Sequence, residues 1–177
     1  MAKLAADVYS EALFALAIEQ DSVDVLAEQV KAAELAFSEN PDFLGLLTHP
    51  KITREEKLSV VEQVFRGRFD DALTGLLTVI VEKGRGCEIS AVFRNFLDKV
   101  REYRKIGVAS VVSATELTGE QKSRIEEKLL SQTDYESFEM QYSVDASLIG
   151  GMKIRIGDRV VDASIQSKLA RMAGSLS

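Results

Sequence analysis

The amino-acid sequence predicts an α+β protein of two domains, an N-terminal six-helix bundle over residues 1–105 followed by a small C-terminal α/β domain over residues 106–177. Three observations predict this division. The chain of 177 residues is longer than one typical domain and too short for two large ones. Both prolines and seven of the eight phenylalanines precede residue 100. Apolar residues recur with a helical period before Gly107 and with a period of two after it.

Two antiparallel helices are expected at the start of the first domain. Apolar residues fill residues 4–18 at helical spacing. Asp21 or Ser22 caps a second helix, and Asn40-Pro41 stops it. The apolar residues of this second helix are Val23, Leu26, Val30, Leu35 and Phe37.

The third and fourth helices are marked by their ends. Pro41 suits the first turn of a short helix, and His49-Pro50 ends it. Thr53-Arg-Glu-Glu56 is a capping box, in which the threonine hydroxyl and the glutamate carboxylate satisfy free amides at a helix start. The fourth helix is therefore expected to run from this box to about Phe65.

Two more helices complete the bundle. Residues 69–83 make a fifth helix, which Gly84 closes. A sixth helix follows, and its apolar stripe is Ile89, Val92, Phe93, Phe96, Val100 and Tyr103.

The second domain begins with a strand and a helix. The segment 108–114 is short and rich in β-branched residues, which favours a strand. Thr118-Gly-Glu-Gln121 is another capping box and opens a helix to about Ser131. Strict alternation of apolar and polar residues over 138–145 predicts a second strand.

A hairpin and a final helix are expected to end the chain. Residues 152–156 alternate in the same way, and Gly157-Asp158 supplies a two-residue turn before Val160 and Val161. Asp162 is then expected to cap a last helix.

The composition excludes several classes of protein. Hydrophobic residues make up 46% and charged residues 28%, which is enough to form a core and argues against disorder. The longest apolar run, Ala12–Ile18, has seven residues, whereas a membrane span needs about 20. No direct membrane insertion is therefore expected, and residues 1–20 carry no signal for secretion or import.

The charge distribution argues against nucleic acid as a partner. The formal net charge is -6, which repels a phosphate backbone. Residues 1–42 hold 2 basic and 9 acidic side chains, whereas residues 83–105 hold 7 basic and 3 acidic ones. One acidic surface and one basic helix are expected in the first domain.

Candidate catalytic groups are scarce. Cys87 is the single cysteine and His49 the single histidine, so an intramolecular disulfide and a zinc site of several such residues are excluded. We interpret His49 as a turn residue and Cys87 as an incidental thiol, and an enzyme that uses either remains the alternative. The glycine-rich stretches fail the spacing of nucleotide-binding loops, so no cofactor and no metal are expected.

Surplus apolar surface is a stronger indication of function than the candidate catalytic groups. The helices expected at 4–18 and 69–83 each carry a second apolar face besides the one that the core needs. Gly75 lies inside the second of these helices, where glycine costs about 1 kcal/mol relative to alanine. Either both helices are central in the bundle, or they form a groove that accepts an amphipathic helix of a partner.

The chain resembles a known family in four stretches. These are Tyr9-Ser-Glu-Ala-Leu-Phe14, Glu82-Lys-Gly-Arg85, Asp145-Ala-Ser-Leu-Ile-Gly-Gly151 and Ile156-Gly-Asp-Arg-Val-Val-Asp-Ala-Ser164. With the order of the two domains, they resemble the delta subunit of the F-type ATP synthase, whose mitochondrial counterpart is the oligomycin sensitivity-conferring protein. Two positions depart from the usual pattern, because Ala146 replaces a proline and Ala163 a glycine.

The resemblance implies a non-catalytic stator subunit. Its helical domain would bind the N-terminal helices of alpha subunits in the catalytic head, and its C-terminal region would join the b subunits of the peripheral stalk. The groove residues that it implies are Tyr9, Ala12, Gly75 and Val79. The alternative is an unrelated adaptor that binds another amphipathic helix.

The resemblance also implies a cellular location and an oligomeric state. It places the chain in the cytoplasm, peripheral to the cytoplasmic face of the inner membrane of a bacterium, with a role in ATP synthesis and hydrogen ion transport. The isolated chain is expected to be a monomer. The signature residues Gly150, Gly151, Asp162 and Ser164 are expected to serve the fold before any contact.

Overall fold

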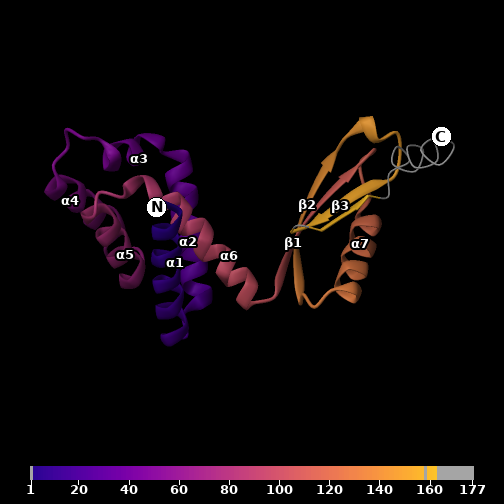
Figure 1. Ribbon diagram of the computed structural model, residues 1–177, viewed down its shortest axis with the longest axis horizontal. Coiled ribbons are helices and arrows are strands. Elements are labelled where there is room, and N and C mark those ends of the chain that lie inside the picture. Colours follow the sequence, from indigo (N-terminus) through magenta and orange to yellow (C-terminus); the bar gives the residue numbers. More distant parts are fainter. Residues whose placement is uncertain (1, 158, 163–177) are drawn as a thin grey trace. The chain divides into compact units, whose positions relative to one another are not determined.

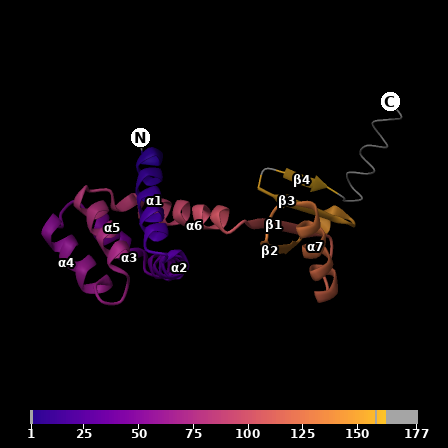
Figure 2. The same cartoon turned by 90° about the horizontal axis from the view of Figure 1, so that it is seen from below.

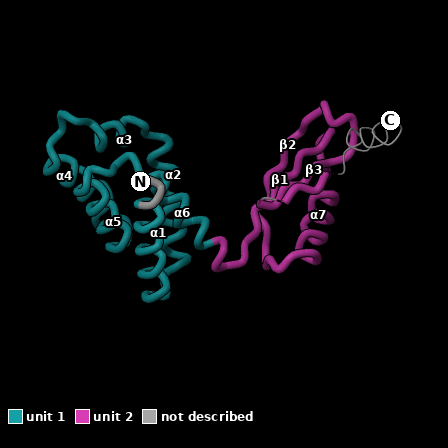
Figure 3. Tube along the Cα trace, in the orientation of Figure 1, with its two compact units in different colours: residues 1–100 teal, residues 101–177 magenta. Residues whose placement is uncertain are grey.

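The computed structural model describes residues 2–157 and 159–162. The chain divides into two compact units, residues 1–100 and 101–177 (Figure 3). The boundary between them falls in the last turn of one helix, five residues before the end of the helical domain expected from the sequence. Each unit has its own hydrophobic cluster, so each is described by itself.

The first unit is built from α-helices (Figure 1). They are α1 (Ala2–Glu19), α2 (Val23–Glu39), α3 (Pro41–Thr48), α4 (Arg54–Phe65), α5 (Asp71–Glu82) and α6 (Ile89–Tyr103). A short 3-10 helix, η1 (Gly86–Glu88), precedes α6. All six helices expected from the sequence are present.

Capping explains where several helices begin. The Thr53 side chain accepts a hydrogen bond from the Glu56 amide while the Glu56 side chain accepts one from the Thr53 amide, which forms the expected capping box. Asp70 caps α5 by accepting from the amide of Ala72 at 2.8 Å. The fifth helix therefore begins at Asp71, and the sequence-based start at Phe69 is wrong because the aspartate outside the helix fixes its first turn.

The core of the first unit is centred on α6 and the phenylalanines. Val92, Phe93 and Phe96 have no exposed surface. Phe96 meets Phe14 of α1 edge to face with ring centroids 6.3 Å apart, and Phe93 meets Phe37 of α2 at 5.8 Å. The amphipathic α6 is therefore the element that α1 and α2 share.

The second unit holds a four-stranded sheet in the order β2-β1-β3-β4. Its elements are β1 (Ile106–Ser113), α7 (Gly119–Gln132), β2 (Ser137–Val144), η2 (Ala146–Leu148), β3 (Met152–Ile156) and β4 (Arg159–Asp162). Strands β1 and β2 are parallel and α7 connects them, whereas β3 pairs antiparallel with both β1 and β4. Figure 2 shows the same elements from below.

One face of this sheet is covered by α7. Ala109 and Val111 of β1 have no exposed surface, and Ile125 and Leu129 of α7 and Phe138 of β2 are buried beside them. The burial of β1 alternates along the whole strand, as the period of two predicts. The expected capping box at Thr118 is confirmed, since its side chain accepts from the amide of Gln121.

The end of the sheet differs from the expectation in one respect. Asp162 is the last residue of β4 and pairs with Lys153 of β3, so it belongs to a strand. The expected hairpin between β3 and β4 is confirmed by the pairing of Ile156 with Arg159. The helix expected after Asp162 lies outside the described residues.

Candidate functional site

The four residues expected to line a partner groove lie on two neighbouring helices. Tyr9 and Ala12 belong to α1, and Gly75 and Val79 belong to α5. These two helices contact each other within the first unit (Figure 1, Figure 2). The structure thus brings together two elements that are about 60 residues apart in the sequence.

Helix α1 has a buried face and an apolar outer face. Leu13 and Ala17 are fully buried against the core. Tyr9 is half-buried and packs on the edge of that core, whereas Ala12 is exposed. Leu16 shares this side of the helix and is 41% exposed, so apolar surface continues along it.

Helix α5 has the same two-sided character. Leu73, Leu77 and Ile80 have no exposed surface, which fixes the face that meets the core. Gly75 is exposed, and a Cβ atom built on it would meet no atom within 4 Å. Val79 lies one turn further along and is 40% exposed. No close packing within the described chain therefore requires a glycine at position 75.

Polar contacts hold α1 in place at the base of this surface. Asn95 of α6 donates a hydrogen bond to the Asp7 carboxylate at 2.7 Å. The fully buried hydroxyl of Ser10 donates to the Asp7 carbonyl oxygen at 2.9 Å. On the other helix, Glu82 forms an ion pair with Arg54 of α4. These contacts help to position both helices within the first unit.

The exposed apolar surface of α1 and α5, which we call the α1–α5 face, includes residues that the sequence did not single out. Val8 is 60% exposed and Leu16 is 41% exposed, and neither was selected as a binding residue. Their apolar character was visible in the sequence, but their exposure depends on which side of α1 the other helices cover. Chemically, this face offers van der Waals contact and burial of apolar area, and its residues supply no paired acid and base.

The signature loop of the second unit is held by its own hydrogen bonds. The Asp145 carboxylate accepts from the Ser147 amide at 2.9 Å and caps η2. Hydrogen bonds from Ser147, assisted by the positive charge of Lys153, lower the pKa of the Asp145 carboxyl below its usual value. Leu148 is 1% exposed and anchors the loop in the unit.

The signature glycines lie at the end of this loop. Gly150 donates its amide to the Leu148 carbonyl oxygen at 2.6 Å. Gly151 has a φ of 81°, a left-handed conformation that favours glycine, and its carbonyl oxygen accepts from the amide of Ala114. Asp162 forms an ion pair with Lys153 at 3.5 Å. Ser164 lies outside the described residues.

The two candidate catalytic residues lie in or next to two neighbouring segments, α3 and η1. His49 follows the end of α3, and its Nδ1 atom accepts a hydrogen bond from the backbone amide of Lys51 at 3.2 Å. Cys87 is an exposed free thiol in η1. Among the residues that the structure describes, no three His, Cys, Asp or Glu side chains are grouped to hold a metal ion. The described helices include none with the length and hydropathy needed to cross a membrane.

Comparisons with known proteins agree with this architecture. A family model described as ATP synthase delta (OSCP) subunit matches residues 5–176. A protein of Lachnoclostridium phytofermentans named ATP synthase subunit delta is 52% identical over 176 residues, which covers 99% of this chain and 97% of that protein. A protein of the same name from a Geobacillus species is 34% identical over 168 residues, or 95% of this chain and 94% of its own.

A solved structure shares the fold. A chain in the mitochondrial ATP synthase hexamer of Toxoplasma gondii superimposes with a TM-score of 0.74 over 97% of this chain and 96% of its own. The two sequences are 21% identical. At that identity the likeness supports the order of a helical unit and an α/β unit, and it supports nothing about individual residues.

Proposed function

The chain belongs to the ATP synthase delta (OSCP) family, and from this premise we propose that it is a non-catalytic stator subunit of an F-type ATP synthase. In this role it links the N-terminal helices of alpha subunits in the catalytic head to the b subunits of the peripheral stalk. The link lets the head resist the torque of the rotor. The subunit then works at the cytoplasmic face of the membrane without entering it.

The α1–α5 face is the observation that carries this proposal. The first unit already has a buried core, yet Ala12, Leu16 and Val79 remain exposed on two helices that contact each other. An amphipathic helix laid on them would remove their apolar area from water, which is the main driving force for such docking. Gly75 would allow the backbone of the partner helix to approach closely.

The division into two units suits a linking role. The head would be bound by the first unit and the b subunits by the second, so that one chain holds two partners at separate surfaces. The signature residues Gly150, Gly151 and Asp162 then maintain the loop and the sheet of the second unit and need not touch the stalk.

A titration with a synthetic peptide of the alpha-subunit N-terminus tests the head-binding site. Gly75→Leu places a large side chain in the open space at position 75, so we expect peptide binding to weaken roughly 5- to 150-fold, the cost of overpacking a tight contact. Gly45→Leu is the matched control, because Gly45 is also a helical, exposed glycine with no atom within 4 Å of its Cβ position and lies on α3.

The stability of both variants is measured in the same experiment by denaturant unfolding. We expect both to remain folded and only Gly75→Leu to lose the peptide. Normal binding by a folded Gly75→Leu protein would place the partner helix elsewhere. Failure of the unmodified chain to join a purified head to b subunits would refute the stator role itself.

A further inference from the structure

Ile149, in the signature loop of the second unit, has an exceptional backbone conformation. Among the residues that the structure describes, three that are not glycine have a positive φ, namely Asp21, Lys105 and Ile149. Asp21 and Lys105 are polar and follow the ends of α1 and α6, where a chain often takes this conformation as it leaves a helix. Ile149 is branched at Cβ, and such a residue rarely adopts a positive φ because its side chain crowds the backbone.

The turn around Ile149 is of the γ type. Ile149 has a φ of 62° and a ψ of -34°. The amide of Gly150 donates a hydrogen bond to the carbonyl oxygen of Leu148, two residues earlier, at 2.6 Å. A γ-turn with a positive φ at its centre is rare and strained. Such conformations persist only where the surrounding structure fixes them, and they occur preferentially at functional sites.

The surrounding structure does fix this turn. The loop leads from β2 to β3 and passes the end of β1, which lies between them in the sheet. The Asp145 amide donates to the Ser113 carbonyl oxygen at 2.8 Å, and the Ala114 amide donates to the Gly151 carbonyl oxygen at 3.3 Å. Both ends of the loop are therefore tied to the end of β1, and the buried Leu148 anchors its middle.

The isoleucine itself gains little from this arrangement within the chain. Ile149 is 71% exposed, which is the largest value among the exposed large apolar residues of the described chain. A single exposed apolar residue needs no explanation by itself. Ile149, however, combines exposure with a strained backbone, and a glycine at this position would remove both unfavourable features. A contact that the free chain does not make would account for the isoleucine.

We propose that Ile149 is an apolar contact through which the second unit holds the b subunits of the stalk. This inference rests on the proposed function, in which the b subunits bind the second unit. Ser147, Gly150 and Gly151 beside it are small, so Ile149 offers a single branched aliphatic side chain that fits an apolar recess of the partner. Burial there would remove its apolar area from water. The fixed turn also limits the conformational entropy that binding costs.

The test compares stability with stalk binding in the full chain. Ile149→Gly removes the strain and the apolar side chain together. We expect its thermal unfolding midpoint, followed by the amide NMR signals of β1, to rise by about 2 to 6 °C. We expect its affinity for the purified soluble part of the b subunits, measured by calorimetric titration, to fall at least tenfold. A residue that serves only the fold would not change the two quantities in opposite directions.

Two further variants serve as controls. Lys105→Gly removes the other positive φ of the second unit, at a polar residue with a φ of 50°. It should leave the affinity for the b subunits unchanged. Ile149→Val keeps a branched aliphatic side chain and should lose much less affinity than Ile149→Gly.

The possible failures point to different errors. Unchanged stalk binding by the Ile149→Gly protein would overturn this inference and leave the stator role intact. A lower unfolding midpoint for Ile149→Gly would make the isoleucine part of the fold and would overturn the inference as well. Normal binding to the b subunits with lost binding to the head would also overturn it, because the contact would belong to another partner. No binding between the unmodified chain and the b subunits would refute the stator role together with this inference.

Discussion

At the scale of single residues, Gly107 shows how one missing side chain positions a neighbour. A Cβ atom at position 107 would lie 2.3 Å from one ring carbon of Phe138 and 2.6 Å from another, which is closer than packed atoms approach. The two residues are partners across the parallel strands β1 and β2. The ring of Phe138 therefore lies over the space that the glycine leaves, in the core beneath α7.

Gly107→Ala should therefore destabilise the second unit. Because Phe138 must move to avoid the new methyl group, we expect the free energy of unfolding to fall by about 1 to 3 kcal/mol. Gly119→Ala is the matched control, since Gly119 starts α7 and has no atom within 4 Å of its Cβ position. Denaturant unfolding measures both, and an unchanged midpoint for Gly107→Ala would mean that the ring is not confined there.

The sequence predicted a second apolar face on α1, but it could not predict which residues of that face are exposed. The spacing of apolar residues on α1 indicated a second face, and Ala12 is indeed exposed. Helical spacing places Phe14 and Leu16 on different sides of this helix, and the structure shows that Phe14 packs on the Phe96 ring of α6 while Leu16 is left 41% exposed. Which flank is covered depends on the position of α6, and helical periodicity contains no information about that position.

At the scale of elements, the capping box at the start of α4 makes the stability of the folded protein depend on pH. Hydrogen bonds from the backbone and the hydroxyl of Thr53 lower the pKa of the Glu56 carboxyl. A carboxyl whose pKa is lower in the folded state stabilises that state above its unfolded pKa. This contribution is lost as the pH falls through the folded pKa.

Thr53→Ala removes the hydroxyl that caps α4 and one of the two hydrogen bonds that lower the Glu56 pKa, whereas the backbone amide at position 53 remains. We expect it to cost about 1 kcal/mol at neutral pH, the usual value for a lost N-cap. We also expect the Glu56 pKa to rise part of the way toward its ordinary value, because the hydroxyl hydrogen bond is lost and the backbone one is kept, as followed by NMR of its side-chain carbonyl carbon. Below the folded pKa of Glu56 the difference in stability between the two proteins should shrink. A Glu56 titration that is the same in both proteins would contradict this account.

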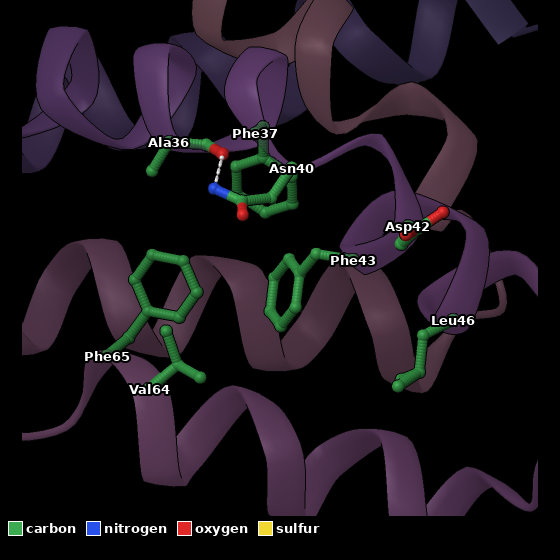
Figure 4. A pocket seen from close by; sticks show the side chains of 8 residues that line it. All are labelled: Ala36, Phe37, Asn40, Asp42, Phe43, Leu46, Val64 and Phe65. Atoms are coloured by element: carbon green, nitrogen blue, oxygen red, sulfur yellow. Dashed lines mark hydrogen bonds between the residues drawn. The ribbon is translucent and has the colours of Figure 1, made fainter.

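Elements that are set by interactions between residues close in the sequence could be predicted from it. Both capping boxes lie within four residues, and each marks the start of its helix correctly. The sheet was less accessible, because its strand order depends on pairing between segments that are far apart, such as Ala109 with both Met140 and Ile156. A pocket of about 420 Å³ is lined by residues of α2, α3 and α4 (Figure 4). It depends on three segments coming together, so no short sequence pattern predicts it.

At the scale of the whole molecule, the question is whether the first unit can stand without the second. The apolar core of the first unit is drawn from α1 to α6, and its buried residues end at Val100. A cut after Lys105 preserves all of these helices. It breaks polar contacts near the junction, among them Arg101 with Glu139 at 2.9 Å and Lys105 with Glu136 at 3.6 Å. Both pairs are partly or largely exposed, and such pairs contribute little to stability.

A fragment of residues 1–105 should therefore fold by itself into a helical monomer. Circular dichroism should show a helical spectrum and one cooperative thermal transition, because all of its core is retained. The fragment should bind the catalytic head about as tightly as the full chain does, since the α1–α5 face lies entirely within it. It should fail to link the head to b subunits, because the second unit is missing. A fragment that is folded but does not bind the head would move the head-binding surface into residues 106–177, and an unfolded fragment would show that the second unit supports the first.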